Sequence, residues 1–266
     1  MTFLRIATVD IETFPIEAYV WDLWDQNVGL NQIIKEWSIA SFCWKWLDLE
    51  DTTKGEIVYM DSRGKKPRND AKILTKLWEL LDEVDIVIAQ NGKAFDIKKI
   101  NARFIEFDYS PPSPYRVIDT MLESRAVAKF SSNKLAWLSD HLTDTPKSEH
   151  KKFPGFELWS ECLKNNPEAW DEMMAYNIVD VEATEKVYMK LRGWIKNHPT
   201  VRHPREEDAG RPMCTKCGSF DTQLRGTYIT NSGIKHQYQC KVCRGYSSGK
   251  QFITPASVRK EMLVSK

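Results

Sequence analysis

The sequence predicts an α/β domain with a mixed sheet, followed by a small second module. Three observations predict this organisation: strand-like segments come first, strands and helices alternate from about residue 69 onward, and two cysteine pairs stand near the carboxyl end. Strands followed by an alternation of strands and helices are typical of a mixed sheet flanked by helices. The 266 residues are enough for one catalytic domain and a small appended module.

Four short segments near the amino end favour strands. Leu4–Asp10 is apolar and ends in an acid, and Trp37–Leu47 carries large residues at even positions, as expected of a strand with one buried face. The tryptophans of Trp37–Leu47 either pack in the core or stack on bases, and packing is the favoured interpretation. The expected strands of this region are Leu4–Asp10, Ala18–Trp24, Trp37–Leu47 and Glu56–Met60.

The pattern then changes to helical spacing. Apolar residues recur every three or four positions between Asn69 and Val84, with Asn69 or Asp70 as the N-cap. Pro167 suits the first turn of a long helix that closes the domain. Beyond the helix Asn69–Val84, we expect strands at Asp85–Gln90 and Arg116–Asp119 and helices at Asp96–Phe107, Thr120–Phe130, Asn133–His141 and Pro167–Lys196.

Residues 197–212 have the composition of a linker, because they combine three prolines and a glycine with a run of charges. They divide the chain into a predicted domain of residues 1–196 and a module of residues 213–266. Residues 209–266 carry ten Lys and Arg against two acids, a net charge of +8, which leaves −7 for residues 1–208. A basic module on an acidic domain is expected to meet a polyanion while the domain holds cations; a module made basic only for solubility is the alternative.

Composition excludes two classes of protein. Hydrophobic residues make up 42% and charged residues 28%, which is a globular balance and not a disordered one. No apolar run reaches the roughly 18 residues that a membrane span needs, so no membrane partner is expected. The amino end reaches a strand and an acid too soon for a signal peptide, and we therefore expect a cytoplasmic protein.

Acidic residues stand at three places that suit metal-assisted phosphodiester chemistry. Asp10 and Glu12 are two apart on a strand and project from one side; Asp96 opens a helix. Tyr176 and Asp180 are four apart and share a helix face. Carboxylates are the ligands that Mg²⁺ or Mn²⁺ prefers, and two such ions activate water and neutralise phosphate charge. Each cluster alone has another explanation, namely a solvated strand end, a helix cap or a helix-face pair.

Order and context together resemble one family. The segments that carry the resemblance are Val9-Asp10-Ile11-Glu12-Thr13, Asn91-Gly92-Lys93-Ala94-Phe95-Asp96 and Tyr176-Asn177-Ile178-Val179-Asp180. They resemble the three motifs of the DEDD superfamily of ribonuclease H-like 3′→5′ exonucleases, over roughly residues 1–196. The superfamily divides by the residue before the last Asp of the third motif. Tyr176 stands four residues before Asp180, and Ala175 stands where the other subgroup has histidine, so the chain resembles the tyrosine subgroup. The resemblance implies a stand-alone enzyme of phage or bacterial type, in the cytoplasm of a bacterial or phage-infected host cell.

The resemblance also implies roles for the residues. Asp10 would bridge two ions, Glu12 and Asp180 would complete the first site, and Asp96 would hold the second ion. Tyr176 would orient the attacking water. Phe14, Asn91, Phe95 and Lys93 would contact the substrate, although Asn91 and Phe95 equally suit a turn and a core aromatic. Lys93 and the neighbouring Lys98, Lys99 and Arg103 either contact phosphates or form a solvated helix face, and both interpretations suit them equally.

The cysteine pattern predicts a zinc ribbon in residues 213–266. Cys214 and Cys217 form one C-x2-C pair and Cys240 and Cys243 another, with a hairpin-like segment between them. Disulfides or a redox pair are the alternatives; a reducing compartment disfavours the first and the duplication disfavours the second. Four thiolates leave no open position, so one structural Zn²⁺ is expected. Its module would capture nucleic acid, or else bind a protein.

Taken together, the sequence predicts a 3′→5′ exonuclease with two Mg²⁺ or Mn²⁺ ions, acting on a nucleic-acid 3′ end and favouring single-stranded DNA. Two alternatives remain open. One is an exoribonuclease or structure-specific nuclease on the same scaffold, and the other is a non-catalytic nucleic-acid-binding adaptor of a replication or repair complex. A replication or repair protein is a further candidate partner.

Overall fold

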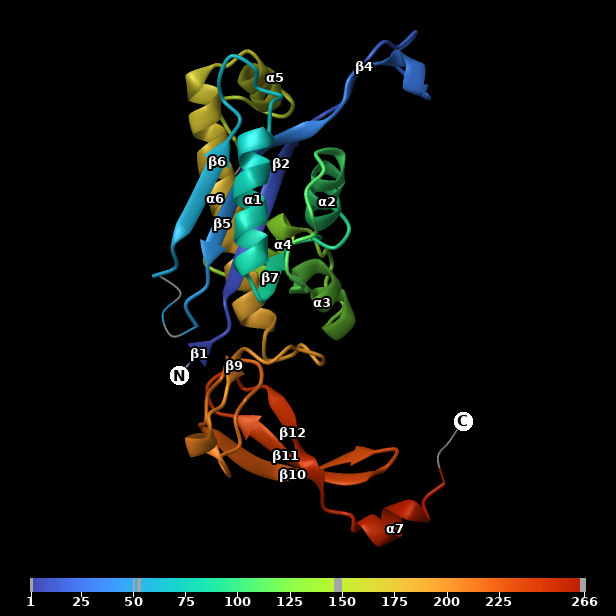
Figure 1. Cartoon of the computed structure of the whole chain (residues 1–266), viewed down its shortest axis with the longest axis vertical. Helices are drawn as coiled ribbons and strands as arrows, with labels where there is room; N and C mark the ends of the chain where they lie inside the picture. The colour runs from blue at the N-terminus through green and yellow to red at the C-terminus, as the bar shows by residue number, and fades with distance from the viewer. Residues whose placement is uncertain (1, 50, 52–53, 146–149, 264–266) are drawn as a thin grey trace. The chain divides into compact units, whose positions relative to one another are not determined.

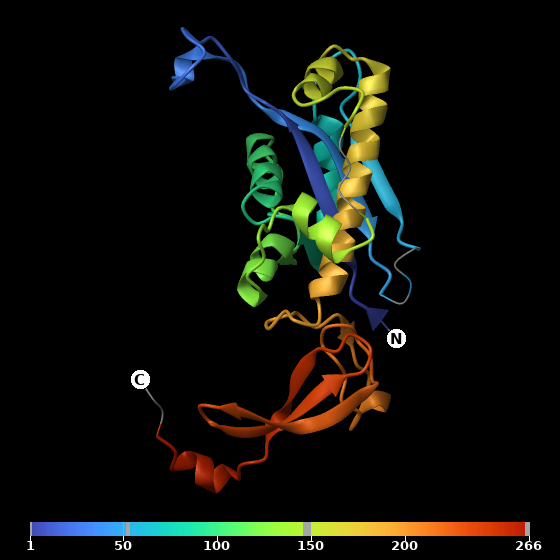
Figure 2. The ribbon, with the colours of Figure 1, turned by 180° about the vertical axis from the view of Figure 1, so that it is seen from behind.

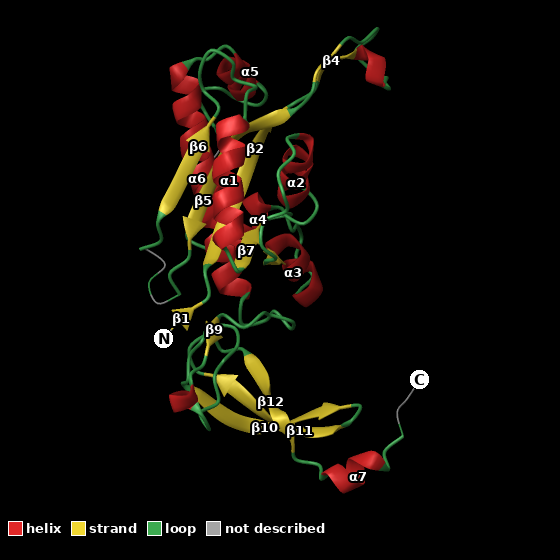
Figure 3. Ribbon diagram, viewed as in Figure 1, coloured by secondary structure: helices red, strands yellow, loops and turns green. Residues whose placement is uncertain are grey.

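The computed structural model describes residues 2–49, 51, 54–145 and 150–263. The chain forms two compact units, one of residues 5–188 and one of residues 1–4 together with 189–266. We call the first unit the body and the second the cysteine unit. Figure 1 labels the elements of both units, and Figure 3 separates helices from strands by colour.

The body is built on a five-stranded mixed sheet with the order β6-β5-β2-β7-β8. The central strand β2 pairs antiparallel with β5, which pairs antiparallel with β6, while β7 and β8 continue parallel to β2 on its other side. This confirms the predicted mixed sheet. The strands are β2 (Ile6–Phe14), β5 (Ser38–Trp46), β6 (Ile57–Asp61), β7 (Ile86–Ala89) and β8 (Arg116–Asp119).

Helices cover both faces of this sheet. Helix α1 (Ala71–Glu83) lies over one face and α6 (Pro167–Leu191) over the other, as Figures 1 and 2 show from opposite sides. Val9 and Ile11 of β2 join the core cluster under α1, because residues two apart on a strand face the same way. Asp10, between them, therefore faces α6, which positions the candidate site on that side.

Strand β5 is buried on both faces, and in this respect the prediction of one buried face was wrong. Phe42 and Trp44 pack in the core cluster under α1, so the favoured core packing of this segment is confirmed for both. The opposite face is also covered, since β5 is an internal strand beneath α6. There Ser41 meets Asn177, and Lys45 pairs with Glu185 at 3.1 Å with both side chains buried.

Asp70 occupies the N-cap position of α1, as expected, but its side chain makes no capping bond. Both of its oxygens instead accept hydrogen bonds from Arg103, at 2.7 and 2.9 Å, and one also accepts from the Ile39 backbone N–H at 3.0 Å. The alternative assignment of Arg103 to a solvated helix face was therefore wrong. A bidentate buried pair of this kind ties α2 to α1 and β5.

The segment after β2 departs most from prediction. Instead of a strand at Ala18–Trp24, only the two-residue β3 (Glu17–Ala18) pairs, with β4 (Ile33–Lys35), across a 3-10 turn at Leu30–Gln32. Figures 1 and 2 show this arm projecting from the end of β2. Trp21 is 95% exposed and Trp24 81% exposed. The apolar run did not form the predicted strand, because among the described residues only Glu17 and Ala18 find a pairing strand, in β4.

The helices that follow α1 in the body agree with the predictions only in part. Helices α2 (Asp96–Glu106), α3 (Thr120–Val127) and α4 (Leu135–Leu142) confirm predicted helices, whereas the short α5 (Glu157–Leu163) was not expected. Helix α6 begins at Pro167 as predicted but ends at Leu191, five residues early. It ends there because the chain turns at Gly193, whose carbonyl accepts a hydrogen bond from the Lys216 ammonium at 2.7 Å.

The cysteine unit has its own small sheets. An antiparallel three-stranded sheet contains β10 (Thr222–Thr230), β11 (Gly233–Cys240) and β12 (Tyr246–Phe252), which confirms the hairpin expected between the cysteine pairs. Strand β1 (Thr2–Phe3) pairs with β9 (Arg202–His203), and a 3-10 turn at Glu206–Asp208 follows. The short helix α7 (Ala256–Lys260) stands near the carboxyl end.

Candidate active site and cysteine cluster

Three carboxylates from the two ends of the body's sequence converge on one point. Asp10 and Glu12 lie on β2, and Asp180 lies on α6, which covers that face of the sheet. One oxygen from each of the three lies within 4.8 Å of the others. Asp10 and Glu12 are partly exposed, whereas Asp180 is only 3% exposed. A cluster of hard oxygen ligands at this spacing fits a divalent cation.

Asp96 is held beside this cluster but is not one of the three. Its side-chain oxygen accepts a hydrogen bond of 3.1 Å from the backbone N–H of Ile11, the residue between Asp10 and Glu12. Burial raises the pKa of Asp96 to about 7, and the charge of Asp119 acts in the same direction against the lowering effect of the Ile11 bond. A buried carboxyl with a raised pKa gains from a neighbouring cation, which favours its ionised form.

A tight loop before α2 delivers Asp96 to this position. Gly92 is needed there because a β-carbon at this residue would lie 2.4 Å from the β-carbon of Ala89. The loop is tied down by Asp119, whose carboxylate accepts hydrogen bonds from the backbone N–H groups of Asn91 and Lys93, both at 3.1 Å. The same carboxylate caps α3. Asp119 is a positioning residue that sequence reasoning assigned only to a strand end.

Asn177 holds Asp10 in place. Its side-chain amide donates a hydrogen bond of 2.6 Å to one carboxylate oxygen of Asp10 and contacts the Asp10 carbonyl at 3.4 Å. The amide oxygen of Asn177 in turn accepts a bond of 3.2 Å from the hydroxyl of Ser41. Asn177 and Ser41 are both fully buried. Sequence reasoning missed Asn177, although its position three residues before Asp180 places both on one face of α6.

Tyr176 stands one helical turn before Asp180, as predicted. The ring of His150 meets the Tyr176 ring edge-on, with 5.3 Å between the ring centres. The Nδ1 atom of His150 lies 2.8 Å from the carbonyl oxygen of Phe153, which fixes the direction of the imidazole. His150 comes from the segment before α5, and no pattern in the sequence connected it with the tyrosine.

The residues proposed to contact substrate fall into two groups. Phe95 is 38% exposed and Lys93 is exposed, and both adjoin Asp96 in the loop where Asn91 adopts a positive φ of 60°. Phe14 is different, because it is fully buried and packs edge-on against Trp170 with 5.9 Å between ring centres. The structure contradicts a base contact by Phe14, whose ring belongs to the core beneath α6.

The four cysteines of the cysteine unit form a second cluster. All four sulfurs lie within 4.8 Å of one another, and two cross pairs, Cys214 with Cys243 and Cys217 with Cys240, are 3.6 and 3.5 Å apart. Tetrahedral zinc–thiolate bonds of about 2.3 Å place sulfurs about 3.8 Å apart, whereas a disulfide needs about 2 Å. The four cysteines are free thiols, which is consistent with a zinc ribbon and not with disulfides.

A family model matches more than half of the chain. The model describes the RNase H superfamily and covers residues 44–192, a range that contains Asp96, Tyr176 and Asp180. The chain belongs to the RNase H superfamily. The predicted ribonuclease H-like fold of the body is thereby confirmed, and membership of this superfamily supports a nuclease.

This RNase H superfamily member is also similar to a solved structure. The chain is similar to a family B DNA polymerase from the hyperthermophilic archaeon Pyrobaculum calidifontis, with 13% sequence identity and a TM-score of 0.48. The match covers 72% of this chain and 26% of the polymerase chain, so this chain spans only about a quarter of the polymerase's length. A comparison with curated proteins gave no match. Within the described residues, no helix is both long enough and apolar enough to cross a membrane.

Proposed function

We propose that this protein is a metal-dependent 3′→5′ exonuclease that hydrolyses phosphodiester bonds at nucleic-acid 3′ ends, with single-stranded DNA as the favoured substrate. The observation that carries this proposal is the convergence of Asp10, Glu12 and Asp180, with Asp96 bonded to the backbone between the first two. Four carboxylates this close repel one another, and bound cations would relieve that repulsion.

The donor set suits a pair of Mg²⁺ or Mn²⁺ ions. Asp10, Glu12 and Asp180 would hold the first ion, and Asp10 and Asp96 the second. When bound, the ions supply the Lewis acidity that generates the nucleophile near neutral pH and relieves charge on the phosphate. Asn177 donates an N–H to one oxygen of Asp10 and so orients the carboxylate that would hold the ions.

Tyr176 would orient the attacking water, and His150 limits the rotation of its ring. Phe95 and Lys93, exposed beside Asp96, would contact the terminal base and a phosphate. The 3′→5′ direction rests on the likeness of the three motifs to the tyrosine subgroup of DEDD exonucleases. The phage or bacterial origin and the cytoplasmic location are proposed on the same likeness.

The cysteine unit would hold one structural Zn²⁺ through Cys214, Cys217, Cys240 and Cys243. Three-stranded units of this size bury little apolar surface, so metal binding would supply much of the folding free energy. Residues 213–266 would form this ribbon, residues 197–212 the linker and residues 1–196 the exonuclease domain.

A cleavage assay with end-labelled substrates tests the proposal. With Mg²⁺ or Mn²⁺, 5′-labelled single-stranded DNA should give a ladder that shortens step by step, whereas 3′-labelled DNA should release labelled mononucleotide at once. Matched duplex and RNA substrates separate DNA from RNA preference, since the 2′-hydroxyl is the feature that differs. Asp180→Ala should abolish the ladder while its melting temperature shows a folded chain. Mononucleotide release from the 5′ end, or full activity in the variant, would contradict the proposal.

A further inference from the structure

Exposed aromatic side chains gather around a cavity in the cysteine unit. Trp194 is 71% exposed, Tyr228 49% and Tyr246 48%. All three line one cavity of about 750 Å³. Trp194 comes from the turn after α6, Tyr228 from β10 and Tyr246 from β12. Clustered aromatic rings with this much exposure often mark a binding site, because their apolar faces are less favourable in water than in contact with another flat surface.

The strand register places the two tyrosines on the same side of the sheet. Tyr228 pairs with Lys235 on β11, and Tyr246 pairs with Gln239 on the same strand. Residues two apart on a strand share a face, and directly paired residues share a face too. Tyr228, Tyr246 and the intervening Gln237 therefore stand on one face, and Gln237 also lines the cavity.

The polar groups around the cavity suit an anion. Lys196 is exposed beside Trp194, whereas Lys216 is buried and its ammonium donates to the Gly193 carbonyl at 2.7 Å. The described lining residues include no carboxylate. Their remaining polar groups are amides and hydroxyls that can donate hydrogen bonds: Asn197, Thr215, Gln237, Ser247 and Ser248.

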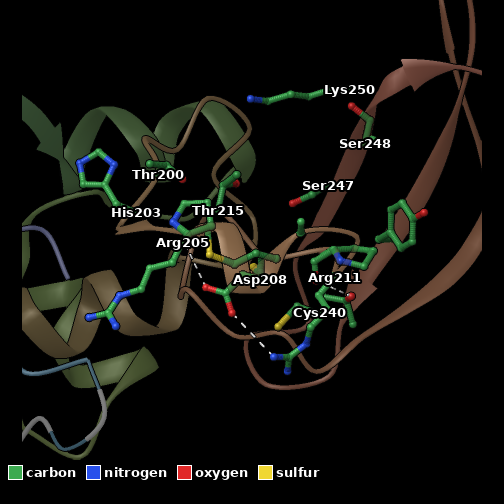
Figure 4. Close-up of a pocket in the computed structure, with 18 residues that line it drawn as sticks. Thr200, His203, Arg205, Asp208, Arg211, Thr215, Cys240, Ser247, Ser248 and Lys250 are labelled. Carbon is green, nitrogen blue, oxygen red and sulfur yellow. Dashed lines mark hydrogen bonds and ion pairs between the residues drawn. The ribbon is translucent and has the colours of Figure 1, made fainter. Parts of the chain in front are cut away.

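A second cavity of the same unit provides a contrast. It has a volume of about 670 Å³ and is lined by Tyr238, which follows Gln237 on β11 and therefore faces the other side of the sheet from the first tyrosine pair. It shares Thr215, Ser247 and Ser248 with the first cavity. Figure 4 shows Asp208 inside it, bonded to the Arg205 backbone at 3.0 Å and facing the Arg211 guanidinium at 3.7 Å. Asp208 places a buried carboxylate in this cavity beside Arg211, whereas the described lining of the first cavity includes none, which makes the first cavity the better site for a polyanion.

We propose that Trp194, Tyr228 and Tyr246 form a stacking site for consecutive unpaired bases of single-stranded nucleic acid, with Lys196 contacting a phosphate. Bases stack on aromatic rings whatever their identity, and a cationic rim follows the backbone, so the site would bind without sequence preference. The inference rests on the proposed function only in the choice of nucleic acid as ligand. It needs no cation at the carboxylate cluster and can be tested separately.

Fluorescence anisotropy of the zinc-loaded full chain tests the stacking site. The probe is a short fluorescein-labelled oligothymidylate, and Asp180→Asn serves as the parent so that the probe is not cut. Trp194→Ala should weaken binding about tenfold, the loss typical of one stacked base. Trp194→Phe should recover most of it, because a ring is restored. Trp194 is exposed, so neither change removes core packing, and equal zinc content and melting temperature check this.

Two further variants separate stacking from charge and one face from the other. Lys196→Ala should lower the slope of log affinity against log salt by about one, whereas Trp194→Ala should leave that slope unchanged. Tyr238→Ser, the matched loss of a ring in the cavity of Figure 4, should leave affinity within about twofold.

Three results would overturn the stacking site. They are parental affinity in Trp194→Ala, an equal loss in Tyr238→Ser, and tight binding of a labelled oligoglutamate with the same dependence on Trp194, which would indicate an acidic protein partner instead. Failure of the nuclease proposal looks different: the wild type would cut nothing, while the losses in Trp194→Ala and Lys196→Ala would persist.

Discussion

Replacing Asn177 by leucine should impair the carboxylate cluster without touching a carboxylate. The fully buried amide of Asn177 donates a 2.6 Å bond to the partly exposed Asp10. Leucine has a similar volume but no donor, so the change leaves the Asp10 carboxylate and the Ser41 hydroxyl without this partner. Losing a hydrogen bond to a charged group costs about 1.5–3 kcal/mol, which corresponds to a fall of roughly 3–10 °C in melting temperature for a body of this size.

The effect on metal affinity is the more informative measurement. Residues that orient a metal ligand typically contribute 10- to 100-fold to affinity, so Mn²⁺ titrated by calorimetry into Asn177→Leu should bind about 10- to 100-fold more weakly than in the wild type. Ser41→Ala is the matched control, because it removes only the outer, neutral bond of 3.2 Å to Asn177. Ser41→Ala should weaken Mn²⁺ binding by less than about tenfold. A destabilised Asn177→Leu protein with wild-type Mn²⁺ affinity would reduce Asn177 to a packing residue and refute the reasoning.

Three other perturbations follow from named contacts. Gly92→Ala should slow cleavage by about a hundredfold in a turnover assay, because the new β-carbon meets that of Ala89 at 2.4 Å and displaces the Asp96 loop; unchanged turnover would show that the loop adapts. Lys45→Met should lower the free energy of unfolding by about 3–5 kcal/mol at neutral pH, because it leaves Glu185 buried without its cation. Burial already raises the pKa of Glu185, so the penalty should shrink as pH falls through that pKa and the carboxyl takes up its proton; urea titrations that give the same loss at neutral and acidic pH would contradict this. Cys217→Ser should reduce bound zinc, measured by atomic absorption, and unfold the cysteine unit while the body still melts cooperatively; full zinc content would reject the four-thiolate site.

Local patterns predicted the body because its elements match their local propensities. The α1 segment buries Ile73, Leu74 and Leu77, as the helical spacing indicated. The order of strands and helices led to the mixed sheet, and the residues Asp10, Glu12 and Asp180 were found because the motifs that contain them resemble those of the DEDD exonucleases. The first strand was predicted to end at Asp10, whereas β2 continues to Phe14.

Contacts between distant residues were less accessible. Asn177 and Asp119 act through partners that only the sheet order brings near: Asn177 is 167 residues from Asp10, and Asp119 is 28 residues from Asn91. Asp70 was predicted as a helix cap, but its carboxylate accepts hydrogen bonds from the distant Arg103 and caps no backbone N–H of α1. The strand predicted at Ala18–Trp24 was wrong because a local pattern cannot show whether a pairing strand is present. In the described residues only Glu17 and Ala18 pair, with β4.

Electron paramagnetic resonance of the zinc-loaded chain with two equivalents of Mn²⁺ tests the carboxylate site most directly. Two ions that share Asp10 would lie about 3.5–4 Å apart and give the spectrum of a magnetically coupled pair. Asp180→Ala should lose that coupling while the chain stays folded. A spectrum of isolated Mn²⁺ ions in the wild type, or the absence of bound Mn²⁺, would contradict the assignment of Asp10, Glu12, Asp96 and Asp180 to a two-metal nuclease site.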